Sequence, residues 1–214
     1  MKHKPHLLVL HNGGLRSLVA SALLLSDEPT PRLTLLHVDD GREARLTRRQ
    51  FVRKQAQALG VTRVTELTAP HFFGHGYGRA PDGGPLGVLT RPQLLLAALA
   101  EAKHQQAEAV VWPVSVGGDA QQGAVATEQA VLCEHLAEAE AEQTPRIETP
   151  LAEMTDQQVI ELGGQLGVDW KLAWTCARPG EQPCMACAGC RRRSQAFDKA
   201  GIIDTLVQPV GAAR

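Results

Sequence analysis

The sequence predicts an α/β protein built on a parallel sheet. Short apolar runs alternate along the chain with segments whose apolar residues recur at helical spacing, and this alternation implies right-handed crossovers between parallel strands. The runs are continuously apolar, as expected for strands that are covered on both faces. With 214 residues and 43% hydrophobic content, the chain can bury a sizeable core. We therefore expect one domain with an appended C-terminal segment.

The expected elements follow one another in a regular order. The strand candidates are residues 5–10, 32–38, 63–67 and 109–116, the last of which is interrupted by Pro113. The helix candidates are residues 17–25, 45–59, 94–103, 128–142 and 156–166. Thr155 is the expected N-cap of the last helix. The stretch 71–87 is too rich in glycine and proline for regular structure, and we predict a mobile loop there, with a functional loop as the alternative.

Charge and hydropathy exclude some classes of partner. The net charge of −1 and the pI near 6.7 give no global basic field, so nucleic-acid binding is not indicated. One local basic run on the helix 45–59 is typical of a solvated face, with a tRNA or nucleotide partner as the alternative. Its residues are Arg42, Arg45, Arg48, Arg49, Arg53 and Lys54.

The longest apolar stretches are too short to cross a bilayer. Residues 94–102 are an example, and they fall well below the roughly 20 residues that a membrane-spanning helix needs. The N-terminal residues also lack the apolar core of a signal peptide. We therefore expect a cytoplasmic protein with no membrane partner.

Four of the five cysteines lie close together near the C-terminus. Cys176, Cys184, Cys187 and Cys190 follow the spacing Cys-x7-Cys-x2-Cys-x2-Cys, which places four thiolates within reach of one tetrahedral ion. Such a set favours Zn²⁺, with an iron–sulfur cluster or free thiols as the alternatives. A shell of four protein ligands leaves no open position, so we expect the metal to be structural. Cys133 falls in a helical pattern and is expected to be a small buried hydrophobe.

A glycine-containing turn joins the first strand to the first helix. Residues 12–17 read Asn-Gly-Gly-Leu-Arg-Ser. Glycines at such a turn let backbone N–H groups approach an anion, and the helix N-terminus adds partial positive charge. A bare glycine turn is a weak motif, because many α/β proteins have one that binds nothing.

The glycine turn, the second strand and the cysteine cluster occur in a specific order. The second strand ends in Asp39-Asp40-Gly41, and the cluster continues through Arg193, Ala196-Phe197 and the residues 201–204. This order resembles the 7-cyano-7-deazaguanine synthase family of queuosine-pathway enzymes, which belongs to the N-type ATP pyrophosphatases. The resemblance is most specific over residues 174–204 and also includes the stretch 150–167 before the first clustered cysteine.

The resemblance implies a five-stranded parallel sheet, a structural zinc and a homodimer. It also implies ATP-dependent conversion of 7-carboxy-7-deazaguanine to its nitrile with ammonia, through two adenylation steps in which Mg²⁺ shields the phosphates. Residues 1–170 would form the ATP-pyrophosphatase-like domain, and residues 171–214 the zinc-binding segment packed on it. The implied ATP-binding residues are Asn12, Gly13, Gly14, Arg16, Ser17, Asp39 and Arg91, and no catalytic residue is assigned.

Several positions depart from the family pattern. Asn12 stands where the family loop has Ser, Arg16 where it has Asp, and Asp156 where it has Lys. The family's Gly-x-Asn-x-x-Asp motif is absent from residues 113–118. The sequence therefore supports two hypotheses, an ATP-consuming synthase that acts on a deazapurine or related carboxylate, and a zinc-stabilised pseudoenzyme that binds a nucleotide or a partner protein.

Overall fold

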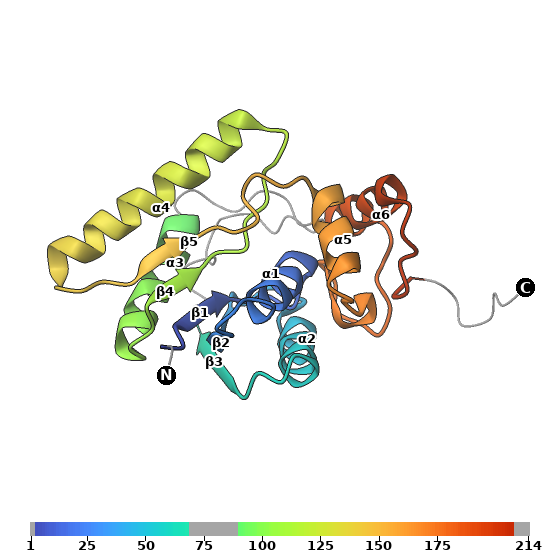
Figure 1. The fold of residues 1–214 in the computed structure, drawn as a ribbon. Helices are drawn as coiled ribbons and strands as arrows, with labels where there is room; N and C mark the ends of the chain where they lie inside the picture. The colour runs from blue at the N-terminus through green and yellow to red at the C-terminus, as the bar shows by residue number, and fades with distance from the viewer. Residues whose placement is uncertain (1–2, 69–89, 208–214) are drawn as a thin grey trace, which may run out of the picture.

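A computed structural model describes residues 3–68 and 90–207 of the chain (Figure 1). The predicted loop 71–87 lies outside the described residues. Five strands form one sheet in the order β3-β2-β1-β4-β5. They are β1 (His6–Leu10), β2 (Arg32–Asp39), β3 (Arg63–Thr68), β4 (Ala109–Val111) and β5 (Arg146–Glu148), and every neighbouring pair is parallel.

Helices cover both faces of the sheet, as the continuously apolar strands predict. On one face, Leu8 and Leu10 of β1 pack with residues of α3 (Thr90–His104) and α4 (Ala120–Glu140). Cys133 belongs to this cluster and is buried, which confirms its predicted role. On the other face, Leu7 and Val9 of β1 pack with α1 (Leu15–Leu25) and α2 (Arg45–Ala58). The fold class predicted from the sequence is therefore confirmed.

Two strands differ from the sequence prediction. β4 ends at Val111, although the apolar run continues to residue 116, because Pro113 has no N–H to donate to a ladder. β5 is not among the predicted strands, since its three residues are too short to give a pattern.

The helix α4 starts at Ala120 rather than at the predicted residue 128. The Asp119 carboxylate caps it by accepting a hydrogen bond from the Gln122 N–H at 3.0 Å.

The C-terminal residues form a layer that packs against α1 (Figure 1). This layer contains α5 (Asp156–Gln165), the short 3₁₀ helix η1 (Trp170–Leu172) and α6 (Ala188–Ala200). Thr155 caps α5 as predicted, within a capping box that includes Gln158. The Trp170 and Phe197 rings meet edge to face, with centroids 5.2 Å apart. The boundary that the sequence suggests at residue 170 stays a prediction.

Among the described residues, no helix combines the length and the apolar character that a bilayer span requires. Part of the predicted basic run is paired with acids: Arg49 and Arg53 of α2 contact Glu66, and Arg42 before the helix contacts Asp40. Arg48 departs from the interpretation as a solvated face, because burial lowers the pKa of its guanidinium.

Candidate functional site

The direction in which successive strands are added reverses between β1 and β4. β1 lies at the centre of the sheet, with β2 and β3 on one side and β4 and β5 on the other. In open α/β sheets, ligands bind beyond the carboxyl ends of the strands where the order reverses. The segment 11–14 leaves β1 at this edge, and the segment 112–119 leaves β4 there. The glycine turn therefore lies where this class of fold binds ligands.

Gly13 is fixed by contacts that only glycine allows. Its φ is +72°, and a Cβ at this position would lie 2.7 Å from the Arg48 carbonyl oxygen of α2. The Gly13 carbonyl accepts hydrogen bonds from the Trp174 N–H at 2.7 Å and from the Gln55 side-chain amide at 2.9 Å. The turn is thereby attached both to α2 and to the segment that leads into the cysteine cluster.

The side chain of Asn12 occupies the inside of the turn. Its Oδ1 accepts from the Gly14 N–H at 2.9 Å and from the Ser17 hydroxyl at 3.3 Å. The Gly13 N–H points instead to His11 Nδ1, at 3.3 Å. The groups that would cradle an anion are thus bonded to the chain's own side chains, and an incoming oxyanion has to replace the Asn12 amide oxygen.

His11 is a buried residue beneath the turn that the sequence analysis missed. Burial, together with the neighbouring His37, lowers the pKa of His11 to about 3, so its ring is neutral at ordinary pH. The His37 Nδ1 lies 3.0 Å from the His11 carbonyl oxygen. Within the described part of the chain, neither ring finds a partner for its Nε2 atom. An apolar run that ends in His gives no signal of this arrangement.

Two of the departures from the family pattern contact each other. The Arg16 guanidinium donates to Asp156 Oδ1 from Nε at 3.0 Å and from Nη2 at 2.6 Å. Arg16 lies in the first turn of α1, and Asp156 is the first residue of α5. The Arg and Asp therefore form an ion pair at the two positions where the family has an acid and a lysine.

Two predicted nucleotide-binding residues, Asp39 and Arg91, make no contact with the turn within the described part of the chain. Asp39 Oδ1 accepts from the Gly41 N–H at 2.9 Å, and its other oxygen is 3.9 Å from Arg45. Arg91 lies in the first turn of α3 and is half-buried. Their roles in binding ATP stay predictions.

The four clustered cysteines converge as the spacing predicts. The Sγ atoms of Cys176, Cys184, Cys187 and Cys190 all lie within 4.8 Å of one another. Cys184 is half-buried, and the other three are buried. The Trp174 and Phe51 rings pack against the cluster, with their centroids 5.2 Å apart. Four thiols at this separation fit one soft metal ion or a small metal cluster.

Backbone N–H groups point at the sulfur atoms. Cys176 Sγ accepts from Arg178 and Cys184, and Cys184 Sγ accepts from Cys187, each at 3.4 Å. N–H donors from Ala186 and Cys187 lower the pKa of Cys184 to about 6, whereas burial raises the pKa of Cys190. Donors of this kind favour the thiolate, which is the form that binds metals. The cluster could therefore hold a metal.

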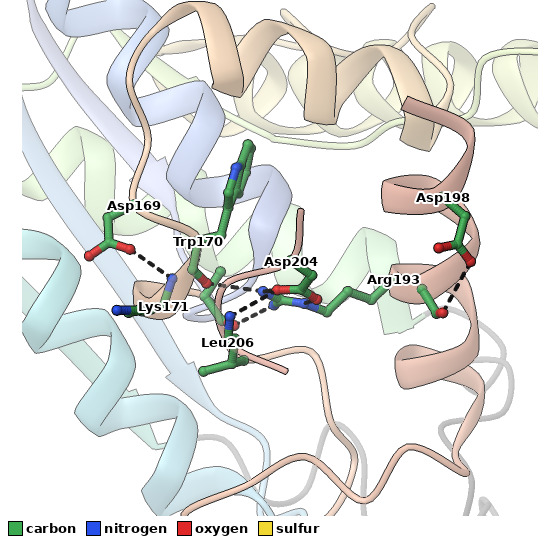
Figure 2. A network of polar contacts seen from close by, with 9 residues as sticks. Asp169, Trp170, Lys171, Arg193, Asp198, Asp204 and Leu206 are labelled. Atoms are coloured by element: carbon green, nitrogen blue, oxygen red, sulfur yellow. Dashed lines mark hydrogen bonds and ion pairs between the residues drawn. The ribbon is translucent and has the colours of Figure 1, made fainter. Parts of the chain in front are cut away.

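Arg193 connects the segments around the cluster (Figure 2). This arginine is only 3% exposed, and its guanidinium donates to both Asp204 oxygens, at 2.5 and 2.7 Å. It also donates to the carbonyl oxygens of Ala173 at 2.6 Å and Trp170 at 3.0 Å. One side chain thus joins α6, η1 and the residues after α6, which fixes the backbone from which the cysteines project.

A family model described as "Queuosine biosynthesis protein QueC" matches residues 93–201, which is about half of the chain. The chain belongs to the QueC family. Among curated relatives, the 7-cyano-7-deazaguanine synthase of Trichodesmium erythraeum is 43% identical over 61 residues, 28% of each chain. The enzyme of the same name from Archaeoglobus fulgidus is 36% identical over 61 residues, covering 26% of its length. The aligned parts are therefore less than a third of these QueC relatives.

Solved structures support the fold of this QueC-family chain. The U34-tRNA thiolase NcsA from Methanococcus maripaludis, solved with its [4Fe-4S] cluster, aligns with a TM-score of 0.56 at 17% identity, over 92% of this chain and 65% of that one. The NMN synthetase of Francisella tularensis aligns with a TM-score of 0.51 at 15% identity, over 94% and 78%. At these identities the similarity concerns the fold alone.

Proposed function

We propose that the protein is an ATP-dependent synthase of the 7-cyano-7-deazaguanine type, which converts a carboxylate on a deazapurine to a nitrile. The proposal depends mainly on one observation: in a QueC-family chain, the glycine turn Asn12–Ser17 follows the carboxyl end of β1, where the strand order reverses. Adenylation of the carboxylate would release pyrophosphate, and ammonia would then displace AMP to give the amide. A second adenylation of the amide oxygen and loss of AMP would give the nitrile.

In this proposal the turn binds the ATP phosphates. Gly13, Gly14 and Ser17 would supply hydrogen-bond donors to phosphate oxygens at the N-terminus of α1, with Mg²⁺ bound to the phosphates. Asn12, Arg16, Asp39 and Arg91 would complete the nucleotide site. Asn12 Oδ1 now accepts from Gly14 and Ser17, so this amide has to rotate away when a phosphate oxygen enters.

We propose Zn²⁺ as the metal of the cysteine cluster and a structural role for it. Four thiolates fill a tetrahedral shell and leave no position for substrate. A thiolate set of this kind persists in a reducing compartment, which supports the cytoplasm as the site of the protein. Elemental analysis should find about one zinc per chain. Iron with acid-labile sulfide would instead indicate an iron–sulfur cluster.

The reaction can be tested directly. Purified protein is incubated with ATP, Mg²⁺, ammonium and 7-carboxy-7-deazaguanine, and AMP, pyrophosphate and nitrile are followed by mass spectrometry. Ser17→Ala should lower the rate roughly ten- to a hundredfold, because one hydrogen bond to a charged phosphate is lost. Ser26→Ala is the matched control, since Ser26 lies at the far end of α1. AMP without nitrile would point to a different acceptor.

A second candidate is a nucleotide-binding scaffold that lacks turnover. One observation favours it: the turn's donors bond to Asn12 and His11, and Arg16 bonds to Asp156. A chain of this kind would bind ATP in calorimetry and yield no AMP under the conditions above. Formation of AMP that depends on the deazapurine excludes the scaffold. Both candidate functions are compatible with the homodimer that the family resemblance implies.

A further inference from the structure

Gln55 of α2 joins the glycine turn to the segment that leads into the cysteine cluster. Its side chain is fully buried, with 0% of the residue exposed. The amide nitrogen donates to the Gly13 carbonyl oxygen at 2.9 Å and to the Leu172 carbonyl oxygen at 2.6 Å. Gly13 belongs to the turn, and Leu172 is the last residue of η1. One side chain therefore bonds two segments that are distant in sequence.

The orientation of the Gln55 amide follows from its partners. Carbonyl oxygens only accept hydrogen bonds, so the amide nitrogen has to face both of them. The amide oxygen, Oε1, is then buried without a hydrogen-bond partner among the described residues, and such an atom lowers stability. An apolar side chain of similar length would avoid that cost. The two bonds from the nitrogen are therefore what explains a glutamine at this position.

The segment that contains Leu172 is bonded to the cysteine cluster from its other side (Figure 2). Arg193 of α6 donates to the carbonyl oxygens of Trp170 at 3.0 Å and Ala173 at 2.6 Å. Cys190 lies almost one turn earlier on the same helix. The segment is thus held between an arginine from the helix of the cluster and a glutamine from the helix beneath the turn.

A second contact runs beside the Gln55 bridge. The Trp174 backbone N–H donates to the same Gly13 carbonyl oxygen at 2.7 Å. The Trp174 ring contacts the Phe51 ring, with centroids 5.2 Å apart, and Phe51 lies one helical turn before Gln55 on α2. Any displacement of the segment 172–174 therefore has to strain or break bonds to Gly13.

We propose that Gln55 is a positioning residue that couples the conformation of the glycine turn to the metal-bound state of the cysteine cluster. When the four thiolates share one metal ion, the backbone that leads into Cys176 is fixed, and Gln55 transmits the position of that backbone to Gly13. Such a coupling is reciprocal, so loosening the turn also loosens the metal. The inference rests on the proposed function in one respect, namely that the positioned turn is the one that binds phosphate.

The test compares Gln55→Met with Gln105→Met in the metal-loaded full-length protein. Methionine is similar in length to glutamine and has no N–H to donate. Gln105 is the matched control, because its amide nitrogen also has two partners, Thr65 of β3 and Glu101 of α3. Hydrogen exchange followed by mass spectrometry reports on peptides that contain the glycine turn. Release of the bound metal to the chromogenic chelator pyridylazoresorcinol reports on the cluster.

Gln55→Met should raise both the exchange rate of the turn and the rate of metal release roughly three- to tenfold, as expected for the loss of one or two hydrogen bonds. Gln105→Met should change neither rate. If Gln55→Met does not fold, Gln55→Asn takes its place, because the shorter amide keeps its donors and cannot reach both carbonyl oxygens. The same two rates then decide.

Three results would overturn the inference: no change in either rate, faster exchange of the turn with unchanged metal release, or equal changes in the control variant. Exchange that rises equally across β1 and β2 would also overturn it, since a side chain that only stabilises the packing of α2 gives that pattern. Neither rate requires a substrate. Absence of nitrile with both rates raised in Gln55→Met therefore removes the proposed function alone, and nitrile formation with both rates unchanged removes the coupling alone.

Discussion

The Arg16 guanidinium and the Asp156 carboxylate form a hydrogen-bonded ion pair across 140 residues of sequence, with Nη2 and Oδ1 separated by 2.6 Å. The pair joins the N-terminal turns of α1 and α5 at the edge of the proposed site. Each residue alone replaces a charge of the family pattern with its opposite. Together they keep one positive and one negative charge in contact, so the two replacements depend on each other.

Because the two replacements depend on each other, a second substitution should restore the stability that the first one removes. Arg16→Asp should destabilise the protein by about 1 kcal/mol or more, because two carboxylates then face each other. Adding Asp156→Lys should restore most of the loss, since the pair is re-formed with its charges exchanged. Both side chains are about one-third exposed, which keeps the effect modest. Urea unfolding of the single and double variants gives the coupling energy, and additive effects would contradict the dependence.

Gly13→Ala should be far more harmful than an alanine at another left-handed glycine. Gly13 and Gly60 have φ values of +72° and +68°, and each should cost about 1–2 kcal/mol for that backbone conformation. Only at Gly13 would the Cβ meet backbone atoms, at 2.7 Å, whereas nothing lies within 4 Å at Gly60. We expect Gly13→Ala to cost a further 1–3 kcal/mol or so. Equal losses in urea unfolding would show that the turn is free to shift.

Arg193→Met should cost about 3–5 kcal/mol, because it leaves a mostly buried Asp204 without its cation. Arg192→Met is the matched control on the next residue, which is exposed and should change stability by less than about 0.5 kcal/mol. Thermal unfolding of the metal-loaded protein measures both. A small loss at Arg193 would mean that the metal alone fixes the segments around it.

Buried His11 predicts a loss of stability in acid. The pKa of this residue is about 3 in the folded chain against 6.5 in its ordinary state, so the unfolded chain binds an extra proton between these values. The contribution of neutral His11 to the free energy of unfolding is fully present above pH 6.5. It declines by up to about 1.4 kcal/mol per pH unit as the pH falls toward 3. His11→Gln should reduce that slope in urea unfolding. The exposed His135 is the control, and an equal reduction in His135→Gln would contradict the assignment.

Much of the fold could be predicted from the sequence, because its central strands are buried. The runs that form β1 and β2 are mostly apolar, and Thr155 with Gln158 forms a capping box that depends only on local sequence. β5 could not be predicted, since its three residues pair with β4 through contacts that arise only in the folded sheet.

The convergence of the four cysteines was also predictable, whereas the details of the turn were not. The cysteine spacing predicts that the four thiols lie together, and they do. By contrast, whether Asn12 points into the turn depends on the side-chain conformation, and the partner of Arg16 depends on how α5 docks on α1. His11 was missed because its environment includes Leu36 and His37 of β2, which are distant in sequence.

The proposed function requires that adenylation activates a deazapurine carboxylate. We would supply 7-carboxy-7-deazaguanine with both carboxylate oxygens as ¹⁸O and analyse the AMP by mass spectrometry. In the proposed reaction the first AMP takes one carboxylate oxygen and the second takes the amide oxygen, so each AMP should carry one ¹⁸O and two labelled AMP molecules should accompany each nitrile. AMP that forms without label, or no AMP at all, would contradict the account.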